Sequence, residues 1–257
     1  MWHQIKSYLF FLLKSKNQHG IHSPFVYELV TICFYDSKKY SEYKAIKTYR
    51  NKVLQCNEII KITDYGAGSR VFKSNERKVS AIAKNAGTTL KKQELLFRLV
   101  RYFKPEHILE LGTSLGLGTS PLAIANSSSK ITTIEGCPNT SKMTQGFFEV
   151  FELNNIQLIN ETFEDFFKAS SSVKYDFVFI DGNHNKEHTL RYFEFLLEKI
   201  SNHSILIFDD IHWNAEMTEA WQIIIQHPKV TVSIDTYYWG FIFFRKEQEK
   251  QHFTIRV

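Results

Sequence analysis

The chain has 257 residues, which suffices for one α/β domain with an N-terminal extension but is short for two full domains. Its hydrophobic fraction of 43% and charged fraction of 23% are those of an ordinary soluble globular protein. The net charge of +5 is compatible with an RNA or anionic-lipid partner, but lysines and arginines are scattered among acids. This pattern excludes an arginine-rich nucleic-acid-binding tail.

Cysteine usage and hydropathy bear on the compartment. Cys33, Cys56 and Cys137 are widely spaced and form no CxxC pair, so we expect neither a zinc site nor a disulfide framework. The longest apolar stretch near the N-terminus, residues 8–13, is far below the roughly 20 residues of a membrane span. No small-residue cleavage site follows it. We therefore expect a cytoplasmic protein without a transmembrane segment.

Residues 1–87 predict a helical extension. Residues 1–16 place apolar side chains at helical spacing, with lysines off that stripe. This favours a helix packed on the main domain or on a second subunit of a homodimer, and an interfacial membrane helix is the alternative. Ser23 and Pro24 predict the start of another helix. Helical patterns continue over 27–60, and residues 73–85 are polar and partly helical. A strand followed by a glycine-rich turn at 59–69 suggests a lid, with residues 64–70 as its loop.

Residues 88–257 predict the catalytic domain. An amphipathic helix over 93–103 stops before Pro105. Strands and helices then alternate, and the two strands nearest the C-terminus read as an antiparallel pair. The pattern predicts an α/β fold with a doubly wound, mostly parallel, seven-stranded sheet. The expected strands are 107–111, 130–135, 156–160, 175–181, 204–209, 230–235 and 240–245.

A glycine loop follows the first of these strands. The segment ILELGTSLGLGTS, residues 108–120, has the spacing G-x-x-x-G-x-G at Gly112, Gly116 and Gly118. Glycines allow positive φ angles and close approach of a ligand to the backbone. The spacing matches neither the dinucleotide fingerprint nor the P-loop, and no lysine follows the last glycine. Glu110, two residues before the first glycine, suits a ligand with a cationic ammonium group. A purely structural tight turn is the alternative.

The second strand ends in an acid. Glu135 lies 23 residues after Gly112 and at the tip of the strand, where a carboxylate can accept both hydroxyls of a ribose. A solvated acid at a strand end would look the same. Together with the glycine loop, Glu135 favours a cofactor that contains a nucleoside.

Acids also end the fourth and fifth strands. Asp181 ends YDFVFID, and Asp209 and Asp210 end SILIFDD. Ligands bind outside the carboxyl ends of such strands, so these side chains are candidates for one site. Clustered carboxylates need a compensating cation, and Mg²⁺ is the natural candidate. The alternative is that Asp210 caps the following helix and Asp209 hydrogen-bonds a loop.

A histidine lies beside the first of these acids. His184 comes three residues after Asp181, and a neutral imidazole there can accept a proton from a substrate hydroxyl or amine. An ordinary loop histidine is the alternative. Trp213 suits the wall of a flat substrate site, or a packing role.

These motifs together resemble one family. The run KKQELLFRLVRYFKPEHILELGTSLGLGTS, the Glu135 strand, YDFVFIDGNH and FDDIHW look like class I S-adenosylmethionine-dependent methyltransferases of the catechol and caffeoyl-CoA O-methyltransferase type. The resemblance covers roughly residues 88–245. It implies that residues 112–118, including Thr113 and Ser114, line the methionine part of the cofactor and that Glu135 holds its ribose. It further implies Thr162, Phe163 and Glu164 near the adenine, Asp181 at the cofactor, and metal ligation by Asp181, Asp209 and Asp210.

Two positions depart from that family's pattern. Metal-dependent members usually carry Asn where Asp210 stands, and commonly Lys where His184 stands. The first 87 residues resemble the extension of uncharacterised bacterial methyltransferases. We expect methylation of a small-molecule hydroxyl, with His184 as the base. The rivals are a tRNA or rRNA methyltransferase, a silent methyltransferase fold used for binding, and a nicotinamide oxidoreductase, which the loop spacing disfavours.

Overall fold

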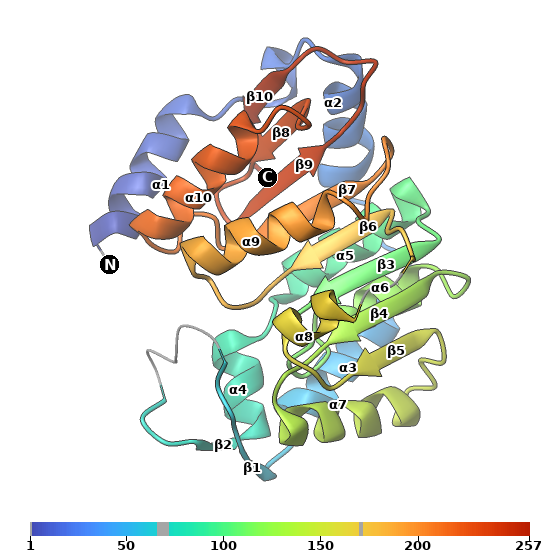
Figure 1. Cartoon of the computed structure of the whole chain (residues 1–257). Helices are drawn as coiled ribbons and strands as arrows, with labels where there is room; N and C mark the ends of the chain where they lie inside the picture. The colour runs from blue at the N-terminus through green and yellow to red at the C-terminus, as the bar shows by residue number, and fades with distance from the viewer. Residues whose placement is uncertain (1, 66–71, 170–171) are drawn as a thin grey trace. The chain divides into compact units, whose positions relative to one another are not determined.

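The computed structural model describes residues 2–65, 72–169 and 172–257 (Figure 1). The chain divides into two compact units. The central unit comprises Asp36–Ser170, and the terminal unit comprises Met1–Tyr35 together with Ser171–Val257. This division does not follow the boundary expected at residue 87, because the first 35 residues join the C-terminal part. Within the described residues, no helix is long and apolar enough to cross a membrane.

Among the described residues of the central unit, three strands pair in parallel in the order β3-β4-β5. They are β3 (His107–Leu111), β4 (Lys130–Ile134) and β5 (Ile156–Ile159). The helices that accompany them are α5 (Leu90–Phe103), α6 (Thr119–Ala125), α7 (Pro138–Val150) and α8 (Phe163–Lys168). Helix α5 begins where the Thr89 side chain accepts from the Lys92 N–H, and it ends at Lys104, whose left-handed conformation precedes Pro105.

The rest of the central unit includes α3 (Tyr43–Leu54), which packs against the glycine loop. It also contains α4 (Val79–Ala86) and the short antiparallel pair β1 (Ile59–Lys61) and β2 (Glu76–Lys78). Tyr49 of α3 is fully buried in one hydrophobic cluster with Leu115 and Leu117 of the loop and with Phe148 of α7. Its hydroxyl donates to the Leu115 carbonyl oxygen at 3.0 Å. Helix α3 therefore holds the glycine loop in place through Tyr49.

The described residues of the terminal unit form five strands in the order β10-β8-β9-β7-β6. They are β6 (Phe177–Ile180), β7 (Ile205–Asp209), β8 (Val232–Asp235), β9 (Trp239–Phe243) and β10 (Gln251–Thr254). β6 pairs with β7 and β10 with β8 in parallel, whereas β9 is antiparallel to both β7 and β8. The helices are α1 (Trp2–Lys14), α2 (Pro24–Glu28), α9 (Lys186–Leu196) and α10 (Ala215–Gln226), with short η1 (Gln18–Gly20) and η2 (Leu29–Phe34).

The fold class is confirmed, with additions. Every one of the seven predicted strands is present, and the chain is α/β with mostly parallel pairing and an antiparallel C-terminal pair. The predicted strand count was wrong: over the described residues β3–β10 number eight, because β10 follows the seven predicted strands. The sequence QHFT of β10 is polar and only partly buried, so it lacks the apolar pattern that reveals a strand.

Candidate active site

The glycine loop joins β3 to α6. Gly112 and Gly116 have φ angles of +106° and +69°, which favour glycine. A Cβ atom on Gly116 would lie 2.4 Å from the Tyr49 hydroxyl and 2.5 Å from the Phe148 ring. Glycine at 116 is therefore required by packing as well as by its backbone conformation. Gly118 is the N-cap residue of α6 and has ordinary helical angles.

Glu110 lies at the end of β3, fully buried. Its Oε2 accepts hydrogen bonds from Thr119 Oγ1 at 2.5 Å and from Thr133 Oγ1 at 2.6 Å. Burial raises the pKa of Glu110 to about 7, although the two threonine hydrogen bonds act in the opposite direction. Within the described part of the chain, Oε1 is buried without a hydrogen-bond partner. The Glu110 carboxyl thus links the start of α6 to β4 through Oε2, and its Oε1 can accept a hydrogen bond from a ligand.

Glu135 lies directly after β4 and contacts the glycine loop. Its Oε2 accepts from the Ser114 N–H and its Oε1 from the Cys137 N–H, each at 2.8 Å. Burial raises its pKa, the two backbone hydrogen bonds lower it, and the nearby Asp64 carboxylate raises it further. The structure therefore brings Glu135 to the loop, as the sequence predicted, and fixes the orientation of its carboxylate.

Threonines also fix the loop residues between the glycines. Thr113 Oγ1 lies 2.6 Å from Thr133 Oγ1. Thr144 of α7 donates to the Ser114 carbonyl oxygen at 2.6 Å, and Ser114 has a φ of +46°. These hydrogen bonds hold Ser114 in a conformation that is uncommon outside glycine, which aims its N–H at Glu135.

Residues 162–164, which the family resemblance implies near the adenine, lie at the start of α8. The Thr162 side chain accepts from the Asp165 N–H at 3.2 Å and so caps the helix, which places Phe163 and Glu164 in its first turn. The end of β5 is tied to Glu135, because Asn160 Nδ2 donates to the Glu135 carbonyl oxygen at 2.6 Å.

Sequence reasoning missed Tyr65, which lies against the residue after Glu135. A Cβ atom on Gly136 would lie 2.8 Å from Cδ2 of the Tyr65 ring, so only glycine permits this approach. The preceding segment is anchored: Asn139 Nδ2 donates to the Lys61 carbonyl oxygen at 2.7 Å, and the Thr63 N–H donates to Cys137 Sγ at 3.3 Å. Of the lid loop expected at 64–70, residues 66–70 lie outside the described residues. The only local signal was an Asp-Tyr pair before a glycine-rich turn.

In the terminal unit, Asp181 and His184 lie together after β6. His184 Nε2 is 3.9 Å from Asp181 Oδ1, and both side chains are partly buried. Asn183 and His184 have φ angles of +69° and +35°, a backbone conformation unusual for residues other than glycine. The His184 ring lies 6.3 Å from the ring of Trp213. The structure therefore brings the predicted base, its carboxylate and the predicted aromatic wall together.

Asp209 and Asp210 end β7. Asp209 Oδ1 accepts from the Asp210 N–H at 2.9 Å, and Asp210 has a φ of +54°. Across residues 2–65, 72–169 and 172–257, no group of three or more His, Cys, Asp or Glu side chains could hold a metal ion. Asp181, Asp209 and Asp210 therefore do not fit a magnesium site with three carboxylate ligands.

Part of the chain matches a known protein family. Residues 109–211, which include the glycine loop, Glu135 and the acidic strand ends, match the family model described as a methyltransferase domain. The chain has the fold of class I S-adenosylmethionine-dependent methyltransferases, and residues 109–211 carry the match to a methyltransferase domain. No curated protein sequence matches it.

Solved structures of methyltransferases share the fold. An O-methyltransferase from Bacillus cereus in complex with S-adenosylhomocysteine is 17% identical, with a TM-score of 0.56 over 82% of this chain and 93% of that one. An S-adenosylhomocysteine-bound methyltransferase from Podospora anserina is 13% identical, with a TM-score of 0.60 over 87% and 97%. The O-methyltransferase TomG from Streptomyces achromogenes, in complex with S-adenosylmethionine, is 14% identical, with a TM-score of 0.57 over 84% and 94%. At these identities the likeness shows the methyltransferase fold.

Proposed function

We propose that this methyltransferase transfers the methyl group of S-adenosylmethionine to a hydroxyl oxygen of a small molecule. The observation that carries the proposal is the Glu135 carboxylate, held at both oxygens by backbone N–H groups beside the glycine loop. An acid fixed in this way keeps lone pairs for two ribose hydroxyls. The S-adenosylhomocysteine and S-adenosylmethionine bound in similar structures support the same cofactor here.

The cofactor-binding roles follow from the central unit. Glu135 would accept the ribose hydroxyls, and the backbone from Gly112 to Gly118 would line the methionine part. Glu110 Oε1, buried without a described partner, would accept from an ammonium group directly or through water. Tyr65, held against Gly136 next to Glu135, would give an aromatic face for the adenine. Residues 162–164 would close the adenine side.

The acid–base chemistry would come from the terminal unit. The cofactor supplies an electrophilic methyl group on a sulfonium, so the acceptor oxygen must lose its proton during transfer. His184 Nδ1 would take that proton, and the Asp181 carboxylate, 3.9 Å from Nε2, would stabilise the imidazolium that results. Trp213 would orient a flat acceptor beside the imidazole. The remaining catalytic effect would come from positioning the two reactants, which is worth roughly 7–11 kcal/mol in well-oriented reactions.

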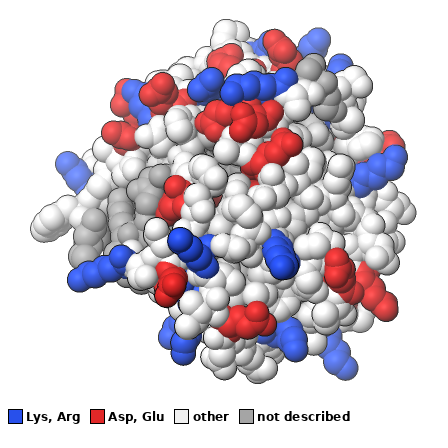
Figure 2. Space-filling model, turned by 60° about the horizontal axis from the view of Figure 1, so that its bottom comes forward, with Lys and Arg blue, Asp and Glu red and all other residues white. Residues whose placement is uncertain are grey.

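An RNA acceptor is the second candidate, and the basic net charge of +5 favours it. Figure 2 shows lysine and arginine side chains interspersed with aspartate and glutamate on the face that it presents. On this face, that mixture differs from the continuous basic surface expected of an RNA-binding site. Lysines and arginines are also scattered among acids along the sequence, so the small-molecule acceptor is the better-supported proposal.

The test is methyl transfer to a panel of acceptors. The full chain would be incubated with S-adenosylmethionine and, separately, with catechols, simple phenols, aliphatic alcohols and total RNA, followed by mass spectrometry. We expect S-adenosylhomocysteine and an O-methylated phenol or alcohol. Methylated RNA without small-molecule product would establish the second candidate. Failure to bind S-adenosylhomocysteine would support a silent fold used for binding.

A further inference from the structure

Helix α1 presents its apolar side outward. Trp2 and Leu13 are 85% and 84% exposed, and Ile5, Leu9 and Phe10 are 48%, 56% and 55% exposed. Trp2, Ile5, Leu9 and Leu13 recur at spacings of three to four residues and so share one face of the helix. A surface helix of a globular protein normally turns such a stripe toward the core, and α1 does the reverse.

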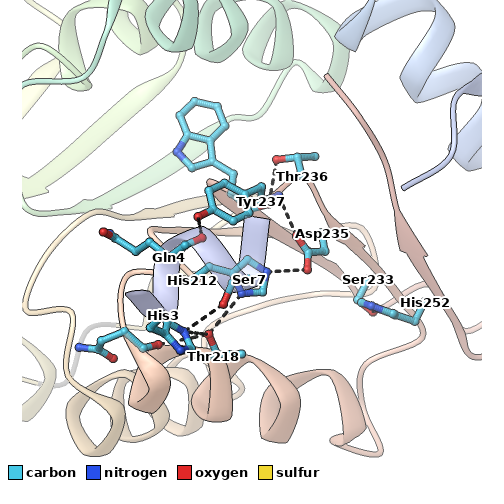
Figure 3. Close-up of polar contacts among 12 residues, drawn as sticks. His3, Gln4, Ser7, His212, Thr218, Ser233, Asp235, Thr236, Tyr237 and His252 are labelled. Carbon is cyan, nitrogen blue, oxygen red and sulfur yellow. Dashed lines mark hydrogen bonds and ion pairs between the residues drawn. The ribbon is translucent and has the colours of Figure 1, made fainter. Parts of the chain in front are cut away.

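The opposite side of α1 is fixed to the terminal unit largely by polar contacts, with Phe11 as its one buried residue. His3 Nε2 lies 3.1 Å from Thr218 Oγ1, and Ser7 Oγ lies 3.2 Å from His3 Nε2. Tyr237 donates from its hydroxyl to the Gln4 carbonyl oxygen at 2.8 Å. Figure 3 shows these side chains pointing toward one another between α1 and the rest of the terminal unit.

Further contacts, centred on His212, fix the residues that hold α1. Thr218 Oγ1 lies 3.2 Å from His212 Nδ1, and His212 Nε2 lies 2.8 Å from Asp235 Oδ2 (Figure 3). The Tyr237 ring stacks on His212 and also meets the Tyr8 ring at 4.9 Å. The orientation of α1 is therefore specified by buried and partly buried groups, so the outward apolar stripe is a built feature of the unit.

The charge around the stripe indicates what covers it. Residues 1–27 contain Lys6, Lys14 and Lys16 and no aspartate or glutamate. Lys6 is exposed and lies next to the exposed apolar residues Ile5, Leu9 and Phe10 on the helix surface. A lysine beside an apolar stripe that carries a tryptophan, with no acid in the same segment, matches the headgroup region of an anionic bilayer, where the lysine stem can extend toward phosphate.

A second copy of the chain fits this face less well. A helix of 13 residues is about 20 Å long and about 10 Å wide, so one face offers far less than the roughly 800 Å² per partner of a stable interface. A bilayer sets no such minimum area.

We propose that α1 is an interfacial helix that binds the surface of an anionic lipid membrane through Trp2, Leu9 and Leu13, assisted by Lys6. The helix lies in the headgroup plane and does not cross the bilayer. The methyltransferase is then held at a membrane surface, which favours acceptors that partition into lipid.

The test is sedimentation of the full chain with vesicles. Vesicles of equal parts phosphatidylglycerol and phosphatidylcholine should carry the protein down, and pure phosphatidylcholine should bind it at least about tenfold more weakly. The double variant Leu9→Gln/Leu13→Gln should lower binding by at least about tenfold, and Lys6→Ser by about fivefold. Ile32→Gln, which changes a 58% exposed apolar residue outside α1, should bind as the wild type does.

Two results would overturn the proposal. One is a wild-type chain that stays in the supernatant with anionic vesicles. The other is equal sedimentation of the wild type and the double variant. Light scattering then identifies the alternative occupant, because a dimer that the double variant dissociates would place a second copy on α1. Circular dichroism of each variant controls for folding.

Discussion

The two units hold their predicted functional residues in different ways. In the central unit, Glu110 and Glu135 each accept two hydrogen bonds of 2.5–2.8 Å that connect β3, β4 and the glycine loop. In the terminal unit, Asp181 and His184 are 3.9 Å apart, and His184 and Asp210 lie in left-handed backbone. Short hydrogen bonds thus fix the two glutamates of the central unit, whereas His184 and Asp210 of the terminal unit lie at loop positions with a positive φ.

This difference matches a division of labour. A cofactor shared by many methyltransferases is best met by a preorganised site, and its binding residues follow a spacing that can be read locally. An acceptor site must differ between enzymes, and loops allow that variation. We therefore expect changes in the central unit to alter cofactor affinity and changes in the terminal unit to alter turnover.

The largest effect is expected at the base. Replacing His184 with Gln should lower kcat by roughly 100- to 10,000-fold on the acceptor found by the panel, because proton removal loses its acceptor. The affinity for S-adenosylhomocysteine, measured by calorimetry, should not change. His203→Gln, which alters an exposed histidine in the same unit, is the matched control. A His184→Gln enzyme with wild-type kcat would remove this residue from the mechanism.

Glu110 should make stability depend on pH. Its pKa is about 7 in the folded chain and 4.5 ordinarily, so between these values the folded state keeps a proton that the unfolded state releases. The free energy of unfolding should therefore fall as pH rises from about 4.5 to 7, by up to about 3 kcal/mol, and change no further above 7. Urea unfolding at several pH values measures this.

The matched variant for that measurement is Glu110→Gln, which keeps the shape of the side chain but does not ionise. Its stability should change less between pH 4.5 and 7 than that of the wild type. If the two proteins show the same pH dependence, Glu110 is not the group that titrates.

A smaller effect is expected at Tyr65. Tyr65→Ala should weaken S-adenosylhomocysteine binding about tenfold, since stacking of an aromatic side chain on a base contributes about 1–3 kcal/mol. Tyr65→Phe retains the ring and should bind as the wild type does. Equal affinities for all three proteins would mean that the ring packs on Gly136 without touching the adenine.

The smallest effect is expected from metal removal. Because Asp181, Asp209 and Asp210 do not form a three-carboxylate group, EDTA should leave kcat unchanged and added Mg²⁺ should not raise it. A loss of activity with EDTA that Mg²⁺ restores would show that these acids assemble around a cation when substrate is bound.

The sequence could predict those features of the fold and site that depend on residue spacing within one segment, and not those that depend on contacts between distant segments. The glycine loop and Glu135 followed from spacing along two consecutive strands, and both are where that spacing placed them. The clamp on Glu110 depends on the register that sets Glu110 opposite Thr133 of β4, which no local pattern encodes. Tyr65 reaches Gly136 only because β1 docks beside α7, a contact between segments about 70 residues apart.

The same limit explains two other results. Apolar periodicity predicted a helix at α1, but the outward direction of its stripe depends on the contact of His3 with Thr218, which lies 215 residues further along the chain. Strand ends predicted acids near one another at Asp209 and Asp210, yet the left-handed φ of Asp210 determines where its side chain points. Backbone conformation at single loop residues is beyond what residue spacing can predict.

The most direct test of the central claim is calorimetric titration of S-adenosylhomocysteine into the wild type and into Glu135→Ala, with Glu161→Ala as an exposed control in the same unit. We predict binding to the wild type and the control, and a dissociation constant at least about 100-fold higher for Glu135→Ala, because hydrogen bonds to a charged group contribute about 1.5–3 kcal/mol each and two are lost. Equal binding by Glu135→Ala, or none by the folded wild type, would contradict the assignment of the cofactor site.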